Sequence, residues 1–353
     1  MKPTQKLHAL GQSLWLDNIT REMLDDGTLK RYIDEFSVTG LTSNPTIFQK
    51  ALAGGAAYDA EIAAAGADID TEALFIRLAL ADLTRAADLF RPVHEASGRM
   101  DGWVSMEVSP LLADDVSGTV EAARQIHRQA ARDNLFVKIP GTAAGVKAIE
   151  ESIFAGVPVN VTLLFSASQY EAVANAWMRG IERRLQNDLD PVVHSTASLF
   201  VSRWDAAVHD QVPAALHNRL GIAVAGQTWA AWRRLVASDR YQKLLKAGAP
   251  LQRLLWASTG TKDPNASDVL YVEALAAPDS INTIPDKTLE AFADHGRVQQ
   301  HLTDDGGDSA RVLAEFEQAG IDVAALAGKL QREGAAAFVQ SWQQLMAEIS
   351  RKR

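Results

Sequence analysis

The sequence predicts an α/β protein, in particular a (β/α)8 TIM barrel with additional helices. Eight short apolar runs alternate with segments of helical periodicity, and this alternation is typical of strands joined by crossover helices. Most of the runs are apolar nearly throughout, as expected for parallel strands that are covered on both faces. The chain has 353 residues, 47% of them hydrophobic, which is enough for one large core or two smaller ones, and α/β barrels of this length occur as single domains.

The predicted strands follow one another at regular intervals along the chain. They are residues 13–18, 38–45, 103–110, 134–141, 157–166, 192–201, 254–260 and 280–285. Amphipathic segments such as 117–133 and 143–156 predict the helices between them, and Thr142 and Ser166 or Ser168 are typical helix caps. A doubly wound sheet would show the same alternation, but no Gly-x-Gly-x-x-Gly opens a helix, so its nucleotide-binding version has no support.

Three regions lie outside the alternation of eight strands with their crossover helices. Residues 51–100 and 202–250 predict long helical excursions, and residues from about 300 to 353 predict C-terminal helices that pack on the barrel as an appendage. We expect residues 1–353 to form a single barrel domain, since none of these regions carries a strand pattern of its own.

Composition excludes several classes of function. The chain has no cysteine, which excludes disulfides, cysteine nucleophiles and thiolate metal sites. A formal net charge of −9 at pH 7 argues against partners such as nucleic acid or an anionic membrane. The N-terminus lacks the apolar stretch of a signal peptide, and no apolar run reaches the length of a membrane span. We therefore expect a cytoplasmic protein.

Polar side chains stand where the predicted strands end. In a barrel of this kind the chemistry lies at the C-terminal ends of the strands. The first five strands bring there an acid, an amide, a second acid, an amine, and an amide with a hydroxyl: Asp17, Asn44, Glu107, Lys138, and Asn160 with Thr162. Each residue alone has a structural explanation such as a cap or a turn. Their joint arrival at one rim predicts an active site.

Lys138 is the most informative of these residues. It stands within the apolar run 135–139, where burying an ammonium costs several kcal/mol unless the charge is paired or lost. An edge strand whose lysine reaches water is the structural alternative. A neutral lysine can attack a carbonyl, and the resulting iminium accepts electrons when a neighbouring C–C bond breaks. With Asp17 and Glu107 available for proton transfer, the pattern predicts Schiff-base aldol chemistry.

A set of motifs, in order along roughly residues 10–300, resembles one family. The motifs are DNI, GLTSNPTIF, SMEVSP, LFVKIPGT, GVPVNVTLLFS, SLFVSRWD and LLWASTGTKDP. Together they resemble the transaldolases, in the longer bacterial subfamily of the class I Schiff-base aldolase superfamily. The resemblance implies a transferase of the pentose phosphate pathway. Such an enzyme moves a dihydroxyacetone unit between sedoheptulose 7-phosphate or fructose 6-phosphate and glyceraldehyde 3-phosphate or erythrose 4-phosphate.

The resemblance also implies a role for each site residue. Lys138 would be the Schiff-base nucleophile, Asp17 the general acid/base on the C4 hydroxyl, and Glu107 with Thr162 the holders of a water that shuttles protons. Asn44 and Asn160 would bind the three-carbon intermediate. The remaining residues implied in substrate binding are Ser198, Phe200, Arg203, Ser258 and Lys262.

The sequence departs from the family at the substrate phosphate. Arg203 matches the phosphate-binding arginine after strand six, with an ion pair to Asp205 as the structural alternative. Shorter transaldolases carry Ser-x-Arg after strand seven, whereas here Lys262 follows four residues after Ser258. We expect Lys262 to replace that arginine, and a solvated loop lysine is the alternative. Lysine is a point charge rather than a bidentate fork, so the phosphate geometry would differ.

Two other functions remain open on the sequence. One is an aldolase that releases dihydroxyacetone, and the other is a non-catalytic barrel that binds sugar phosphates. The related aldolases are shorter and tend to alter the residue equivalent to Glu107, so its presence here favours transfer. Histidines are scattered with no His-Glu-x-x-His, so we expect no metal and no cofactor. Sugar phosphates are the expected partners, and a monomer and a homodimer are equally compatible with the sequence.

Overall fold

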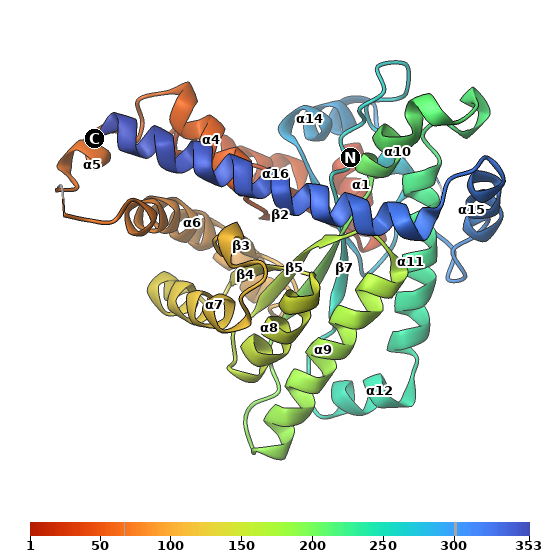
Figure 1. The fold of residues 1–353 in the computed structure, drawn as a ribbon, viewed down its shortest axis with the longest axis horizontal. Coiled ribbons are helices and arrows are strands. Elements are labelled where there is room, and N and C mark those ends of the chain that lie inside the picture. The colour runs from red at the N-terminus through yellow and green to blue at the C-terminus, as the bar shows by residue number, and fades with distance from the viewer. Residues whose placement is uncertain (67, 300–301) are drawn as a thin grey trace.

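Eight parallel strands form the centre of the molecule, and they confirm the predicted (β/α)8 TIM barrel (Figure 1). The computed structural model describes residues 1–66, 68–299 and 302–353. The strands are hydrogen-bonded in the order β2-β1-β8-β7-β6-β5-β4-β3. A parallel bridge between Gly40 and Trp103 joins β2 to β3 and closes the ring. Their bounds are Ser13–Leu16 (β1), Val38–Leu41 (β2), Val104–Glu107 (β3), Leu135–Pro140 (β4), Val159–Leu164 (β5), Ser195–Phe200 (β6), Arg253–Ala257 (β7) and Ile281–Ile284 (β8).

Helices surround the barrel and alternate with its strands. Each predicted run overlaps one strand, and the predicted caps Thr142 and Ser166 accept hydrogen bonds from the backbone N–H of Gly145 (3.0 Å) and Gln169 (3.2 Å). The helices are Pro3–Leu10 (α1), Arg21–Asp25 (α2), Thr28–Phe36 (α3), Pro45–Gly54 (α4), Asp59–Ala64 (α5), Thr71–Ala96 (α6), Val116–Ala130 (α7), Ala143–Phe154 (α8), Ala167–Gln186 (α9), Ser202–Val208 (α10), Leu220–Val236 (α11), Asp239–Lys246 (α12), Leu270–Ala274 (α13), Asp286–His295 (α14), Ser309–Gln318 (α15) and Val323–Lys352 (α16), with 3₁₀ turns at Pro110–Leu112 (η1), His209–Gln211 (η2) and Ala214–Leu216 (η3).

A buried polar network closes the N-terminal end of the barrel. The Arg253 guanidinium donates hydrogen bonds to Ser13 Oγ (2.6 Å) and to the carbonyl of Ser280 (2.7 Å). The indole of Trp15 donates to the carboxylate of Asp101 (2.8 Å), which Ser13 also contacts. These side chains satisfy one another's hydrogen bonds, so they occupy the N-terminal end of the barrel. A ligand is therefore expected at the opposite, C-terminal end.

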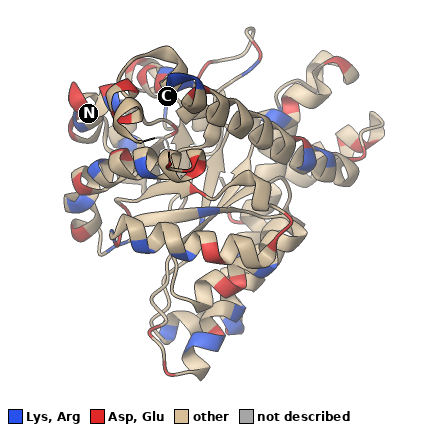
Figure 2. Cartoon of the chain, turned by 60° about the vertical axis from the view of Figure 1, so that its left-hand side comes forward, with Lys and Arg blue, Asp and Glu red and all other residues tan. Residues whose placement is uncertain are grey.

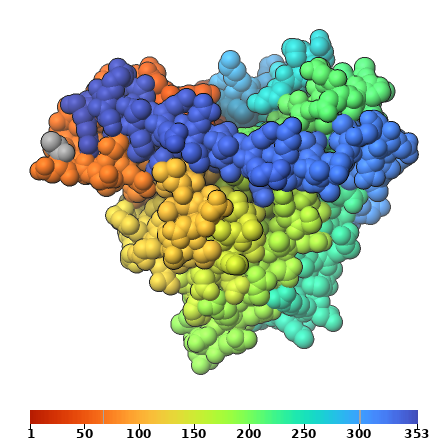
Figure 3. Space-filling model, in the orientation of Figure 1, coloured from red at the N-terminus to blue at the C-terminus, as the bar shows by residue number. Residues whose placement is uncertain are grey.

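The C-terminal helix α16 crosses the barrel at the C-terminal ends of the strands (Figures 1 and 3). Gln331 donates hydrogen bonds to the carbonyls of Gly141 and Leu163, both at 3.0 Å, and so ties the helix to the ends of β4 and β5. Farther along, Ser341 contacts Thr46 of α4 at 2.7 Å. The predicted C-terminal appendage therefore includes a helix, α16, that lies across the C-terminal end of the barrel. We call this helix the α16 strap.

Buried apolar side chains form one contiguous cluster from Leu7 in α1 to Ile349 in α16. This continuity supports our proposal that the chain is a single domain. Acidic and basic residues are interspersed along the outer helices (Figure 2). Among the described residues, none of the helices has both the length and the apolar character that crossing a membrane requires.

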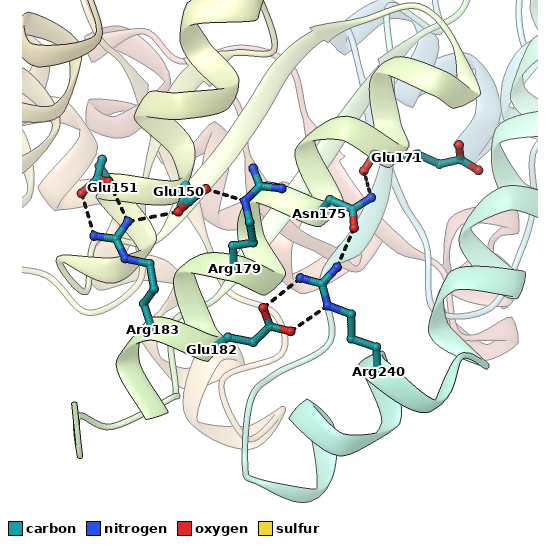
Figure 4. A network of polar contacts seen from close by, with 8 residues as sticks. All are labelled: Glu150, Glu151, Glu171, Asn175, Arg179, Glu182, Arg183 and Arg240. Atoms are coloured by element: carbon teal, nitrogen blue, oxygen red, sulfur yellow. Dashed lines mark hydrogen bonds and ion pairs between the residues drawn. The ribbon is translucent and has the colours of Figure 1, made fainter. Parts of the chain in front are cut away.

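An ion-pair network links three of the outer helices (Figure 4). Arg183 of α9 pairs with Glu150 (3.1 Å) and Glu151 (2.6 Å) of α8. Nearby, Arg240 of α12 pairs with Glu182 of α9 at 2.7 Å. Each of these carboxylates therefore has a guanidinium partner in a partly exposed position.

Candidate active site

Three of the predicted site residues lie at one level inside the barrel. Glu107 on β3 is the register partner of Lys138 on β4, which in turn is the register partner of Asn160 on β5. Register partners on neighbouring parallel strands point to the same face. The amide of Asn160 extends this row to β6, where Ser198 Oγ donates a hydrogen bond to Asn160 Oδ1 (2.7 Å).

Lys138 is buried and close to an acid. Its residue is 5% exposed, and Nζ donates a hydrogen bond to the carbonyl of Ser43 (2.9 Å). Glu107 Oε1 lies 3.7 Å from Nζ, which is longer than a direct hydrogen bond. Strand β4 pairs with β3 and β5 on its two sides. The alternative of an edge strand whose lysine reaches solvent is therefore wrong.

Glu107 is held in a site that disfavours its charge. The residue is 8% exposed, and neither carboxylate oxygen has a hydrogen-bond partner among the described residues. Burial raises the pKa of Glu107 to about 7, although the nearby Lys138 opposes the shift. Thr162 Oγ1 on β5 is also buried without a partner in the described part of the chain. Buried polar groups of this kind require a partner, which a water or a substrate can supply.

Asp17 lies directly after β1 and is positioned by a neighbouring strand end. Thr42 Oγ1 donates a hydrogen bond to Asp17 Oδ1 (2.8 Å) and also contacts Thr283 Oγ1 (2.7 Å). Burial raises the pKa of Asp17, while the charge of Lys138 and the hydrogen bond from Thr42 lower it. The site thus contains two acids whose protonated forms are favoured by burial.

Asn44 serves a structural purpose as well as lining the site. It is the N-cap of α4, and its Oδ1 accepts a hydrogen bond from the backbone N–H of Ile47 (3.0 Å). Pro45 follows at the first helical position, where its missing N–H costs nothing. Among the described residues, the Nδ2 group of Asn44 has no hydrogen-bond partner, so it is available to a ligand.

The backbone is irregular at two strand ends of the site. Leu163 has φ 59° and Ser258 has φ 56°, the left-handed region that costs a non-glycine residue roughly 1–2 kcal/mol. The register of β5 against β6 also shifts between Val161 and Leu164. Such irregularities re-aim side chains, and here they flank Thr162 and the end of β7.

A cavity of about 120 Å³ opens at this end of the barrel. Its lining residues are Asp17, Thr42, Asn44, Lys138, Thr162, Ser198, Phe200, Arg203, Ala257, Ser258, Gly260, Lys262, Thr283, Pro285 and Phe338. The structure therefore brings nine of the eleven predicted residues to one cavity, while Glu107 and Asn160 lie in the buried row that contains Lys138. The separate predictions from individual strand ends describe one site.

Arg203 supplies positive charge inside the cavity. Its guanidinium lies over the ring of Phe200, 4.9 Å from the centroid. Burial lowers the pKa of Arg203, and the charges of Asp17 and Glu107 oppose this shift. The carboxylate of Asp205 is engaged elsewhere, by the backbone N–H of Leu220 (2.8 Å) and by other donors. The alternative in which Arg203 is merely the ion-pair partner of Asp205 is therefore wrong.

Lys262 is exposed at the rim of the same cavity. Ser258, also at the rim, contacts Ser202 of α10 at 2.9 Å and so links the end of β7 to the helix that carries Arg203. The loop after β7 thus presents one cation and one hydroxyl beside Arg203.

A comparison with known protein families identifies one family for nearly the whole chain. The family model described as Transaldolase/Fructose-6-phosphate aldolase matches residues 14–349. The chain belongs to this enzyme family. It is similar to a protein named Transaldolase from Thiobacillus denitrificans, with 42% identity over 358 residues that cover 99% of this chain and all of the relative.

Other relatives extend the similarity. One named Transaldolase from Parafrankia sp. is 42% identical over 360 residues, covering 99% of this chain and 97% of the relative. One named Transaldolase 2 from Nostoc punctiforme is 39% identical over 363 residues, covering 97% and 95%. The resemblance inferred from the motifs is therefore confirmed at the level of the family.

In this transaldolase-family chain, Phe338 is a cavity residue that the sequence analysis missed. Phe338 projects from α16, four residues after Gly334. A Cβ added at Gly334 would lie 2.9 Å from Leu163 Cδ2 and 3.1 Å from Arg203 Nη1. The absence of a side chain at Gly334 lets the helix approach the barrel closely. The apolar spacing of 334 and 338 along a helix was visible, but nothing in the sequence indicated that this helix covers the mouth.

Proposed function

We propose that the chain is a transaldolase of the pentose phosphate pathway that transfers a dihydroxyacetone unit through a Schiff base on Lys138. The observation that carries this proposal is a buried amine 3.7 Å from a buried carboxylate whose pKa is about 7. A cavity reaches the amine from the C-terminal ends of the strands. Family membership and relatives named Transaldolase support the same activity.

The first chemical step is formation of the imine. Neutral Lys138 Nζ attacks the C2 ketone of the donor, and the carbinolamine that results must lose its oxygen as water. Glu107 would supply and recover the proton, either directly or through a water held by Thr162. A carboxyl group whose pKa is about 7 exists in both protonation states near neutral pH, so it can act as acid and then as base.

The second step is cleavage of the C3–C4 bond. Asp17 would remove the proton of the C4 hydroxyl, whose oxygen becomes the carbonyl of the departing aldehyde. The electron pair of the C3–C4 bond moves to C3 and onto the iminium nitrogen, which leaves an enamine on Lys138. The acceptor aldehyde then adds at the same carbon, and Asp17 returns its proton to the new alkoxide. The burial that raises the pKa of Asp17 makes its carboxylate a stronger base for the first of these proton transfers.

The other cavity residues would hold the substrate. Asn44 Nδ2 and Ser198 Oγ line the cavity and would contact the hydroxyls of the three-carbon unit. Asn160, in the buried row, donates a hydrogen bond to Ser105 Oγ (3.1 Å) and accepts one from Ser198 (2.7 Å), and it would exchange one of these for the substrate. Arg203 and Lys262 would bind the phosphate, with Ser258 as a neutral donor. Phe200 and Phe338 would form the apolar wall.

The aldolase alternative differs only in the fate of the enamine, which water protonates in an aldolase. The narrow cavity and the α16 strap favour transfer, because both limit the access of water to Lys138. The non-catalytic alternative would leave the buried amine and the two acids without a use. We further propose that the protein is cytoplasmic and acts as a monomer or homodimer on sugar phosphates.

Borohydride trapping tests the proposal. The protein is incubated with fructose 6-phosphate, reduced, digested, and the modified peptide is identified by mass spectrometry. We expect a reduced three-carbon adduct on Lys138 that disappears when erythrose 4-phosphate is added before reduction. Release of free dihydroxyacetone at the same rate with and without acceptor would indicate the aldolase instead. The absence of an adduct, or an adduct on another lysine, would favour the binding barrel.

A further inference from the structure

Beside the active-site mouth, three potential metal ligands from separate segments meet. They are His209 in η2, His217 directly after η3, and Asp263 in the loop between β7 and α13. One donor atom from each lies within 4.8 Å of the other two, and all three residues are half-buried. The two imidazole rings face each other at a tilt, with centroids 4.3 Å apart.

Hydrogen bonds around the cluster orient its side chains. The Asp263 carboxylate accepts hydrogen bonds from Asn218 Nδ2 (2.7 Å) and from the backbone N–H of Asn265 (2.9 Å). The His217 ring places Nε2 3.3 Å from the carbonyl of Val212. With the proton on Nε2, the lone pair is on Nδ1. Support of this kind, from a carbonyl to a histidine and from donors to a carboxylate, is characteristic of metal ligands.

We propose that His209, His217 and Asp263 form a binding site for a divalent transition-metal ion, with Zn²⁺ as the reference ion. Two imidazoles and one carboxylate are a ligand set that suits zinc and its neighbours in the first transition series. This set leaves a fourth position for water. Nothing in the transaldolase chemistry proposed above requires this ion, so the site stands apart from Lys138 and its acids.

The space around the cluster can accommodate the ion. A cavity of about 250 Å³ is lined by His209 and Asp263, and His217, outside this lining, has a ligand atom within 4.8 Å of theirs. Bond lengths of 2.0–2.1 Å place tetrahedral ligand atoms about 3.3 Å apart, so the side chains must close by roughly 1.5 Å at most. Lys262 lines the same cavity and is the cation that opposes a metal there. Because its side chain is exposed, the ammonium can turn to solvent.

The position of the site gives it a structural consequence. Asp263 follows Lys262 directly, and Lys262 lines both this cavity and the active-site cavity. An ion at Asp263 would therefore fasten the loop after β7 to the segment between α10 and α11.

Isothermal titration of the metal-stripped protein with ZnCl₂ in a non-chelating buffer tests the proposal. The variants are His217→Ala and Asp263→Asn, each compared with wild type. The matched control is His295→Ala, an exposed histidine whose two ring nitrogens already contact Asp268 (2.9 Å) and Asp294 (3.3 Å). Circular dichroism and the metal-free melting temperature establish that each variant is folded.

We expect one Zn²⁺ per chain in the wild type and in His295→Ala, and affinity at least about tenfold weaker in His217→Ala and in Asp263→Asn. The visible absorption of the Co²⁺-loaded protein should show nitrogen and oxygen ligation, and this spectrum should change in both ligand variants. Equal affinity in all four proteins, or no saturable binding by the wild type, would overturn the proposal.

Discussion

Charged side chains gather both at the barrel mouth and on the outer surface between α8, α9 and α12, and the two regions hold them differently. On the outer surface, Glu150 contacts both Arg179 (2.6 Å) and Arg183 (3.1 Å), so its charge is balanced (Figure 4). At the mouth, Glu107 lies 3.7 Å from Lys138, and its oxygens accept no hydrogen bond from the described residues.

The consequence appears in the pKa values. Hydrogen bonds from Arg183 lower the pKa of Glu151 on the surface, whereas burial raises that of Glu107 to about 7. A surface carboxylate of the first kind stays ionised and contributes little to stability. One of the second kind destabilises the fold when ionised, but it can exchange a proton near neutral pH. Glu151 is thus placed where it stays charged and paired, whereas Glu107 is placed where it can take up and release a proton.

The largest effect is expected at Lys138. Lys138→Met should reduce transfer activity by at least about 10⁴-fold, because it removes the buried amine beside Glu107 that we assign to the imine, while Lys262 lies exposed at the rim. The melting temperature should fall or stay the same, since the variant leaves the buried Glu107 carboxyl group without the neighbouring Lys138 amine. Activity is measured in a coupled assay and stability by thermal unfolding. The matched control is Lys147→Met, an exposed lysine on α8, which should retain full activity. A Lys138→Met protein with more than a few per cent of wild-type activity would contradict the assignment.

The next effect is expected at Glu107. Glu107→Gln should lower kcat/KM by roughly 10²–10⁴-fold and abolish a pH dependence with an apparent pKa near 7. The measurement is a pH–rate profile of both proteins. An unchanged profile in the variant would show that another group is responsible for that ionisation.

Stability gives a second measurement on the same variant. The folded pKa of Glu107, about 7, lies above its ordinary value of 4.5, so folding favours the protonated form. Its contribution is fully present below the ordinary value and is lost as the pH rises through about 7. Urea unfolding at about pH 5 and about pH 8 should therefore show Glu107→Gln gaining stability relative to wild type at the higher pH.

A smaller effect is expected at the α16 strap. Gly334→Leu should raise KM for sugar phosphates and lower kcat/KM by roughly 10-fold, because the side chain would collide with Leu163 and Arg203 and displace Phe338. Gly328→Leu is the control in the same helix, since the nearest atom there is the flexible end of Arg332 at 3.4 Å. The Michaelis constants of both variants are compared. Equal behaviour of the two would mean that α16 does not shape the site.

The smallest effect is expected in the outer network. Glu151→Gln should cost less than about 1 kcal/mol of unfolding free energy, because a partly exposed pair is screened by solvent. The pKa of Glu151 is lowered in the fold, so this contribution is present above its ordinary value of 4.5 and is lost as the pH falls through the lowered pKa. Activity should not change. In the same urea experiment, Glu151→Gln should therefore lose stability relative to wild type at the higher pH, whereas Glu107→Gln should gain it.

Much of the fold and of the site could be predicted because the apolar pattern of a strand depends only on residues that are close in sequence. Lys138 and Glu107 were found by a rule that needs only the order of strands and the polar residues at their ends. The same rule missed Phe338, which is contributed by a helix about 200 residues after Lys138 in sequence order. It also missed the meeting of His209, His217 and Asp263, since no fixed spacing connects a 3₁₀ turn to a distant loop.

By itself the sequence determined the eight strands, their parallel order and the arrival of Glu107, Lys138 and Asn160 at one end of the barrel, because alternation and periodicity depend on neighbouring residues. The strand register that puts these three residues at one level belongs to the tertiary structure. Only the tertiary structure decided how α16 closes the mouth and how strongly Glu107 is desolvated. Burial and through-space charge depend on all surrounding atoms, and those atoms come from segments that the sequence places far apart.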